Sequence, residues 1–466
     1  MDRIPSRFQG IEIPADKPFK NDKLGYSKYS SVLKGMVDMY KDTGCVIAIN
    51  GKWGTGKTTF IKMWEASLPI EEYNTIYFNA WETDYFADPL VAILGELKTI
   101  SQDDEAFKKV ASTLGKVLTA AGGAVLRGVI KKTTGVDSDE IVDTVSAVKS
   151  SINDALDKYK EQKQSLEEFK QKLSEYVAGQ NGKTVVFIID ELDRCNPHYA
   201  VRVLEIVKHL FDVPNICFFL TIDKTQLECS IKGFYGNGEI DAENYLRRFI
   251  DIEFSLPKPT IKDFTALLFA NYHFADYFSG LEDCQKAKSG SESLQALACD
   301  LFDGFNLDLR SFDKVMAHTR LALMQLGNSA ILVELVYLLC FLRIVKPDLF
   351  MALQEHRYSM QELVNQIESS FPRVLLDESL DYKYSLNAHH TMYVIGPLLS
   401  MYDNNTGYHT EGVFHGISES GEFPIVCSVM DKEKLREAII WFHRVGSRSI
   451  SLDYAIEKVA LLQQFK

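Results

Sequence analysis

Two short stretches of the sequence carry residue types that handle phosphate groups and metal ions. The first, GKWGTGKTTF, fits the pattern G-x-x-x-x-G-K-[ST], with Gly51, Gly56, Lys57 and Thr58 at the fixed positions. Glycines let a backbone close around phosphates, because a residue without Cβ adopts the required dihedral angles at little cost. We expect Lys57 to reach the β and γ phosphates of a nucleotide and the Thr58 hydroxyl to bind Mg²⁺.

The rest of this loop completes the expected nucleotide-binding set. Its N–H groups and the N-terminus of the following helix direct positive dipole at an anion. Gly54 and Thr55 lie within the loop, and Thr59 is an expected contact to the α phosphate. The alternative, a glycine-rich turn without a ligand, is disfavoured because the stretch lies between an apolar strand pattern and a helix pattern.

The second stretch, TVVFIIDELDRC, is an apolar run that ends in adjacent carboxylates. Asp190 at the strand end is placed to hold Mg²⁺ through water, and Glu191 to polarise the attacking water. Like charges side by side repel, so packing alone does not explain this pair. If Glu191 makes only a structural salt bridge, the protein would bind nucleotide and turn it over very slowly.

A further strand, NICFFLTID, ends in polar residues. Thr221 and Asp223 are placed to sense the γ phosphate or to orient water. The alternative is a strand end followed by a helix that Asp223 caps. Thr221 favours the functional interpretation, and for Asp223 both interpretations stay open.

Three arginines are candidates to report on the γ phosphate. Arg247 and Arg248 precede a sheet-edge strand, where an arginine could act across a subunit interface and raise the rate by roughly 10³ to 10⁵. The alternative for them is surface pairing with Asp251 or Glu253. Arg310 lies at the start of a later helix. There it would contact the γ phosphate as part of a lid, and the alternative is a solvated helix start.

The elements that must position these residues follow from hydrophobic periodicity. Apolar runs that alternate with amphipathic stretches predict a three-layer α/β domain with a parallel sheet, interrupted by a charged, helical insertion. After Pro257 and Pro259 the strand patterns give way to helices, a lid and then a C-terminal helical domain. The expected divisions are an N-terminal lead (1–30), the α/β core (31–260) with its insertion (about 101–182), the lid (261–345) and the C-terminal domain (346–466).

Composition narrows the class of protein. The 466 residues are 46% hydrophobic, and 64 acidic against 51 basic residues give no strong signal for nucleic acid, although a local basic groove stays open. Eight cysteines without a C-x-x-C pair indicate reduced, buried thiols in a cytoplasmic protein, and no apolar signal segment is found at the N-terminus. The apolar stretch 113–130 contains Lys116 and Arg127, which disfavour a membrane span.

Together these segments resemble the KAP family of P-loop NTPases. The motifs GKWGTGKTTF, YFNAWETDYFADPLVAIL, FIIDELDRC, IVKHLFDVPNICFFLTIDKTQLE and AENYLRRFIDIEFSLP follow the family's order, over about residues 20–345. The resemblance implies a parallel sheet of order 5-1-4-3-2, and ATP with Mg²⁺ as ligands. Trp81 belongs to the segment that matches the family's FNAW motif, and it is expected to lie in the hydrophobic core. In the family's DRC motif, Asp193 and Arg194 are expected to form an ion pair.

The resemblance also bears on the cellular role. Many family members carry transmembrane helices between the two nucleotide motifs, whereas the insertion in this chain is mostly charged helix. Bacterial members resemble parts of phage-exclusion systems, so the resemblance implies a role in defence. The leading hypothesis is a cytoplasmic ATPase that acts as a nucleotide-controlled switch or assembly engine in antiviral defence.

Several alternatives stay open. They are a non-hydrolysing ATP-binding scaffold, an effector nuclease and a membrane-anchored protein. The adjacent His389 and His390 are interpreted as helical packing, because no Cys, Asp or Glu completes a metal set with them. A homo-oligomer, or a protein partner bound through the insertion or the C-terminal domain, is expected. ATP is preferred to GTP because no N-K-x-D motif is present and because the resemblance implies it.

Overall fold

The structure is a computed structural model in which two compact units are distinguished. The described residues up to Lys258 form one unit, and those from Pro259 onward form the other. The structure describes residues 12–85, 89–100, 105, 107–113, 152–179, 182–210, 213–236, 240–281, 284–326, 333–377, 394–406, 413–414, 423–445 and 450–461.

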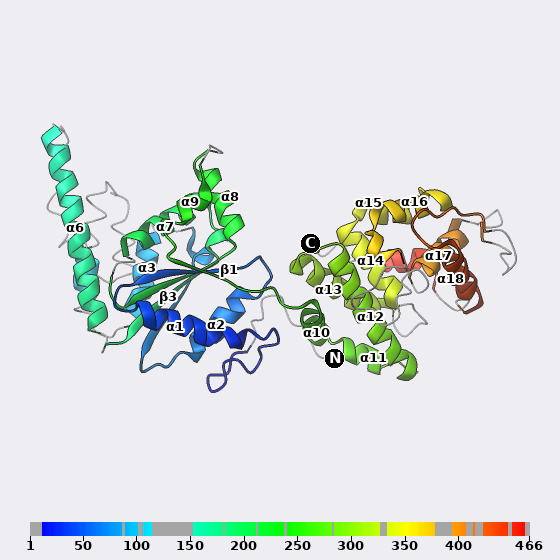
Figure 1. The fold of residues 1–466 in the computed structure, drawn as a ribbon, viewed down its shortest axis with the longest axis horizontal. Coiled ribbons are helices and arrows are strands. Elements are labelled where there is room, and N and C mark those ends of the chain that lie inside the picture. Colours follow the sequence, from blue (N-terminus) through cyan, green and yellow to red (C-terminus); the bar gives the residue numbers. More distant parts are fainter. Residues whose placement is uncertain are drawn as a thin grey trace. The chain divides into compact units, whose positions relative to one another are not determined.

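The first unit is built on a five-stranded parallel sheet (Figure 1). Its order is β2-β3-β4-β1-β5, which confirms the order that the family resemblance implies. The strands are β1 (Cys45–Asn50), β2 (Tyr73–Asn79), β3 (Thr184–Asp190), β4 (Ile216–Ile222) and β5 (Ile252–Ser255). Because all strands run parallel, their carboxyl ends meet at one edge, where the loops with polar residues begin.

Helices cover both faces of this sheet, so the unit has three layers (Figure 1). Alternate strand residues point to opposite faces. In β3, for example, Val186 and Ile188 pack with α1 and α2, and Phe187 and Ile189 pack on the other face. The helices of the two layers are α1 (Ser30–Tyr40) and α2 (Lys57–Ser67) on one face, and α3 (Pro89–Leu97), α7 (Pro197–Leu210), α8 (Lys224–Phe234) and α9 (Ala242–Leu246) on the other.

Short 3₁₀ turns connect several of these elements. They are η1 (Tyr26–Tyr29), η2 (Trp81–Thr83), η3 (Lys98–Ile100) and η5 (Leu192–Arg194). The turns η2 and η5 directly follow β2 and β3, so both lie at the carboxyl edge of the sheet.

The insertion contains a long helix, α6 (Ile152–Ala178), which extends along the sheet unit in Figure 1. Its C-terminal half packs on the core, because Phe169, Leu173 and Tyr176 are buried there. The Tyr176 hydroxyl donates to the Leu97 carbonyl at 3.1 Å, which joins α6 to the end of α3. An inserted helical segment is what the sequence predicts, and a partner-binding role for it stays a prediction.

The second unit is helical in the part that the structure describes. Its helices are α10 (Ile261–Asn271), α11 (Phe274–Ser279), α12 (Cys284–Gly304), α13 (Leu309–Leu326), α14 (Val333–Val345), α15 (Pro347–Gln354), α16 (Met360–Ser370), η6 (Arg373–Leu375), α17 (Gly396–Thr406), α18 (Lys432–Val445) and α19 (Leu452–Leu461). The apolar helix α14 lies at its centre and packs against α12, α13, α15 and α19. The expected division of this region at residue 345 stays a prediction.

Two expectations fall on residues that the structure does not describe. His389 and His390 lie outside the described residues, as does the apolar stretch 113–130 apart from Thr113. Within the described part of the chain, no helix has both the length and the apolar character that crossing a bilayer requires.

Candidate functional site

The glycine-rich loop connects β1, which lies between β4 and β5 in the sheet, to α2 and curls tightly on itself. Gly54 and Gly56 have φ angles of 85° and 84°, in the left-handed region that favours glycine. A Cβ added at Gly51 would lie 3.0 Å from the Thr55 hydroxyl oxygen and 3.3 Å from the Lys57 side chain. The glycines of the motif are therefore required by the closed course of the loop.

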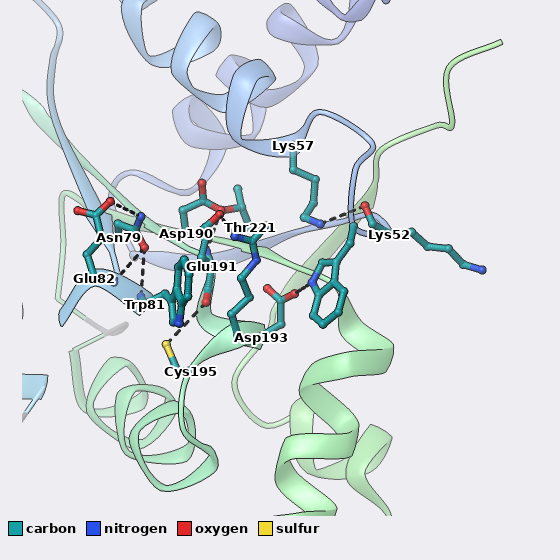
Figure 2. Close-up of polar contacts among 12 residues, drawn as sticks. Lys52, Lys57, Asn79, Trp81, Glu82, Asp190, Glu191, Asp193, Cys195 and Thr221 are labelled. Atoms are coloured by element: carbon teal, nitrogen blue, oxygen red, sulfur yellow. Dashed lines mark hydrogen bonds and ion pairs between the residues drawn. The ribbon is translucent and has the colours of Figure 1, made fainter. Parts of the chain in front are cut away.

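Lys57 lies folded back into this loop (Figure 2). Its ammonium nitrogen donates to the Gly51 carbonyl at 2.5 Å and to the Lys52 carbonyl at 3.3 Å, and the residue is 8% exposed. Burial lowers the pKa of Lys57, and the charges of nearby carboxylates, led by Asp193, oppose this shift. The ammonium group is thus held within the loop by two backbone carbonyls, and its contact with a phosphate stays a prediction.

Thr58 and Thr59 follow in the first turn of α2 and are half-buried. The first N–H groups of a helix have no partner within it, so this turn presents donors and positive dipole at the loop. Thr55 is 2% exposed, and its hydroxyl donates to the Lys52 carbonyl at 2.8 Å. The predicted nucleotide-binding residues are thus brought together around one loop, and their contacts with a nucleotide stay predictions.

Asp190 ends β3 and is 1% exposed. Its carboxylate accepts hydrogen bonds from the Tyr77 hydroxyl at 2.7 Å, from the Glu191 backbone N–H at 2.8 Å and from the Thr221 hydroxyl. Thr221 is fully buried and lies beside Asp190 in the register of β3 and β4. Burial and the Asp190 charge raise the pKa of Tyr77, so this phenol stays a donor. Sequence reasoning missed Tyr77, whose one signal is its place two residues before the end of β2.

Asp190 and Thr58 offer the oxygen ligands that Mg²⁺ prefers. Mg²⁺ uses few protein oxygens and keeps several waters, which suits one carboxylate and one hydroxyl. Among the described residues no group of three or more His, Cys, Asp and Glu is arranged to hold a metal ion. One carboxylate and one hydroxyl fit a metal ion that a bound nucleotide would also hold, and this arrangement stays a prediction.

Glu191 is the first residue after β3 and has an unusual backbone. Its φ is 60°, in the left-handed region, where a residue with a side chain is strained. Its Oε1 lies 2.6 Å from an Arg194 guanidinium nitrogen. Burial raises the pKa of Glu191, while the Arg194 charge opposes the shift and the Asp190 charge adds to it.

The expected ion pair between Asp193 and Arg194 is wrong. Arg194 pairs with Glu191, and Asp193 accepts a hydrogen bond from the indole N–H of Trp53 in the phosphate loop. The two side chains leave the η5 turn in different directions, so adjacent opposite charges do not meet. Asp193 is 6% exposed, and its burial raises its pKa.

The expected core position of Trp81 is also wrong. Trp81 is 51% exposed, because it follows the end of β2 in the η2 turn. Its ring centroid lies 5.6 Å from the guanidinium carbon of Arg194. The apolar type of this residue misled the sequence reasoning, and the preceding Asn79, which ends the strand, was the available signal for a turn.

Asp223 caps a helix, as one of its two interpretations predicts. It is the N-cap of α8 and accepts from the Gln226 N–H at 3.4 Å. Its other oxygen accepts from the Trp53 backbone N–H at 3.2 Å. This carboxylate therefore also braces the phosphate loop.

Arg247 and Arg248 lie on the surface near the edge strand β5. Arg247 pairs with Glu243 at 2.9 Å, and Arg248 is exposed and makes no ion pair with another described residue. The alternative pairing with Asp251 or Glu253 is wrong. Asp251 accepts from the Val46 N–H, and Glu253 binds Lys224 and Asn50. A role of either arginine across a subunit interface stays a prediction.

Arg310 belongs to the second unit. It is half-buried at the second position of α13, after Asp308, whose carboxylate accepts from the Ser311 N–H at 2.9 Å. The two units are described separately, so a role for Arg310 as a lid residue stays a prediction.

The sheet order, the phosphate loop after β1 and the carboxylate at the end of β3 together define a P-loop NTPase. The model of the KAP family P-loop domain matches residues 26–324, and the chain belongs to this family. It is 20% identical over 259 residues to the Phage T7 exclusion protein of Escherichia coli (strain K12), a match covering 52% of this chain and 34% of that protein. The chain therefore spans about a third of that relative's length.

Among solved structures, the chain is similar to the Aeropyrum pernix ORC2 protein in its ADPNP-ADP complexes. The identity is 12% and the TM-score 0.33, with 99% of this chain and 97% of that chain covered.

Proposed function

We propose that this protein is an Mg²⁺-dependent ATPase that works as a nucleotide-controlled switch or assembly engine. The observation that carries the proposal is the place of Glu191, directly after the buried Asp190 at the edge of the sheet where the phosphate loop begins. A carboxylate there can polarise a water for attack on the γ phosphate. ATP is proposed because the sequence has no N-K-x-D motif and because of the family.

Each residue of the site then has a separate task. Lys57 neutralises the β and γ phosphates, while Thr58 and Asp190 hold the metal ion. An Mg²⁺ ion held by Thr58 and Asp190 would supply positive charge to offset the negative charge that develops on the phosphate in the reaction. Glu191 orients the water and accepts its proton, and the Thr221 hydroxyl holds the Asp190 carboxylate in place.

The proposal is tested by measuring ATP binding and phosphate release with the Lys57→Ala variant. We expect both to be lost, because the loop would lose the charge that reaches the phosphates. The control is Lys232→Ala, which removes an exposed lysine from α8. Wild-type phosphate release by Lys57→Ala would contradict the proposal.

A second candidate function is an ATP-binding scaffold that does not hydrolyse. One observation favours it, since the Glu191 carboxylate is already paired with Arg194 at 2.6 Å. Nucleotide retained through purification, together with no detectable phosphate release, would support the scaffold over the ATPase.

We further propose a role in phage defence, supported by the similarity to the Phage T7 exclusion protein. Expression in a phage-sensitive bacterium should reduce plaque formation, and the Lys57→Ala variant should not. If wild type and Lys57→Ala protected equally well, the defence role would not depend on nucleotide binding.

Four finer proposals accompany this function. The protein acts in the cytoplasm, and it assembles with itself or with a protein partner through the helical insertion or residues 346–466. Arg247 or Arg248 completes the site of a neighbouring subunit. Arg310 links loss of the γ phosphate to movement of the helical lid.

A further inference from the structure

The turn that follows Glu191 is braced by two tryptophans from separate segments. On one side, Trp53 of the phosphate loop donates to Asp193. On the other, the Arg194 guanidinium lies against the exposed Trp81 indole, with 5.6 Å between the guanidinium carbon and the ring centroid. The site described above uses Glu191 but gives no task to Arg194 or Trp81.

The backbone explains why Arg194 reaches Glu191. In a 3₁₀ turn, side chains three residues apart lie on the same side. The turn η5 covers Leu192–Arg194 and begins directly after Glu191, so the guanidinium returns to the carboxylate, with 2.6 Å between them. The Arg194 and Glu191 side chains are 30% and 15% exposed, so the pair is only partly open to solvent.

The Trp81 indole, against which Arg194 lies, is attached to the end of the sheet. The Trp81 backbone N–H donates to the Asn79 side-chain oxygen at 3.1 Å, and Asn79 ends β2 beside Asp190 in the strand register. A guanidinium over an indole face gains a cation–π attraction, and its planar shape suits both a ring and a carboxylate. Trp81 therefore fixes the position of Arg194 relative to the strand ends.

From this geometry we propose that Arg194 is a positioning residue, which holds the Glu191 carboxylate in its working orientation and is itself held by Trp81. The inference rests on the proposed hydrolysis. An unpaired Glu191 side chain would be repelled by the charges of Asp190, which directly precedes it, and of Asp193, two residues after it. Arg194 counters this repulsion on one carboxylate oxygen. A misplacement of about 1 Å in a reacting group can cost on the order of 100-fold in rate.

The variants Arg194→Gln, Arg194→Lys, Trp81→Ala and Trp81→Phe test the proposal through steady-state ATP turnover. We expect Arg194→Gln to lower kcat by about tenfold to 100-fold, with KM and ATP affinity close to wild type. Arg194→Lys should recover part of the loss, since it keeps the charge without the planar fork. Trp81→Ala should lower kcat less than Arg194→Gln, and Trp81→Phe, which keeps a ring face, least of all.

The double variant Trp81→Ala with Arg194→Gln gives the sharpest readout. If Trp81 acts through Arg194, the double variant loses no more activity than Arg194→Gln alone. The matched control is Arg202→Gln on α7, which breaks another Arg–Glu pair three residues apart, at 3.3 Å from Glu205. We expect kcat of this control to equal that of wild type.

The outcomes separate the inference from the proposed function. Additive losses in the double variant, or an Arg194→Gln kcat equal to or above wild type, would overturn the positioning role while hydrolysis stands. An increase would show that Arg194 restrains Glu191. A wild-type chain that binds ATP without releasing phosphate would overturn the proposed hydrolysis and the inference with it.

Discussion

Asp190 combines deep burial with three hydrogen-bond donors, from Tyr77, Glu191 and Thr221. A buried carboxylate is stable only when its lone pairs are satisfied, so these donors belong to the site as much as the carboxylate does. Two of them come from the neighbouring strands β2 and β4. The sheet register therefore sets the orientation of this carboxylate.

The substitution Thr221→Val removes one of these donors and keeps the shape of the side chain. The variant should be less stable by about 1–3 kcal/mol, because the buried Asp190 carboxylate loses a partner. The Mg²⁺ concentration for half-maximal ATP turnover should rise about 10- to 100-fold, since the ligand loses its support. Urea unfolding and Mg²⁺ titration measure these effects.

The control for this substitution is Thr225→Val at an exposed position of α8. If Thr221→Val matched this control in stability and in Mg²⁺ dependence, the proposed support of Asp190 would be wrong.

At the scale of elements, the N-terminal turn η1 supports the phosphate loop. The Tyr26 hydroxyl donates to the Thr55 carbonyl at 2.7 Å and to the Pro257 carbonyl at 3.2 Å, and Tyr26 is 4% exposed. Pro257 follows β5, just before the chain leaves the first unit at Lys258. One hydroxyl thus joins the loop to the end of the sheet domain.

Tyr26→Phe should lower the free energy of unfolding by about 0.5–1.5 kcal/mol and weaken ATP binding, because the loop backbone loses its donor. The control is Tyr40→Phe in α1, whose hydroxyl makes no hydrogen bond with another described residue. Calorimetry with and without nucleotide measures both effects. An unchanged ATP affinity would show that η1 does not support the loop.

His318 in α13 gives the second unit a pH-dependent stability. Its Nδ1 is buried and lacks a partner among the described residues. Burial, with repulsion from Arg343 and Lys314, lowers the pKa of His318 to about 4 from an ordinary 6.5. Between these values the unfolded chain binds the proton and the folded chain does not, so stability falls as pH falls from about 6.5 towards 4.

His318→Gln should therefore reduce the loss of stability between pH 7 and pH 5, whereas His198→Gln, at an exposed position, should not. Urea unfolding at both pH values is the measurement. If the stability of His318→Gln fell between pH 7 and pH 5 as much as that of wild type, other groups would cause the effect.

The elements also show what could be predicted from the sequence. Buried strands such as β1 and β3 are continuous apolar runs, and the phosphate loop has a fixed spacing, so these elements and Asp190 were predictable. The direction in which a side chain leaves a short turn depends on its backbone. The pairing of Arg194 with Glu191 therefore could not be predicted from residue types, whereas Asn79 at the end of β2 was a signal for the turn that leaves Trp81 exposed.

At the scale of the whole molecule, the account predicts assembly that depends on nucleotide. With a non-hydrolysable ATP analogue, light scattering after size-exclusion chromatography should show a larger species than with ADP. Replacing Arg247 and Arg248 together by Gln should leave this assembly intact but lower kcat by about 10³-fold, if either completes a neighbouring site. A single size under all conditions, or unchanged turnover in the variant, would exclude a role in trans.

The central claim is that Glu191 activates the attacking water beside a metal held by Asp190 and Thr58. The most direct test compares phosphate release by wild type and Glu191→Gln at saturating MgATP, with ATP affinity measured on the same samples. The account predicts that Glu191→Gln binds ATP as tightly as wild type and releases phosphate at least 100-fold more slowly, as expected on losing a general base (~10²–10⁴-fold). Phosphate release by Glu191→Gln at the wild-type rate would contradict it.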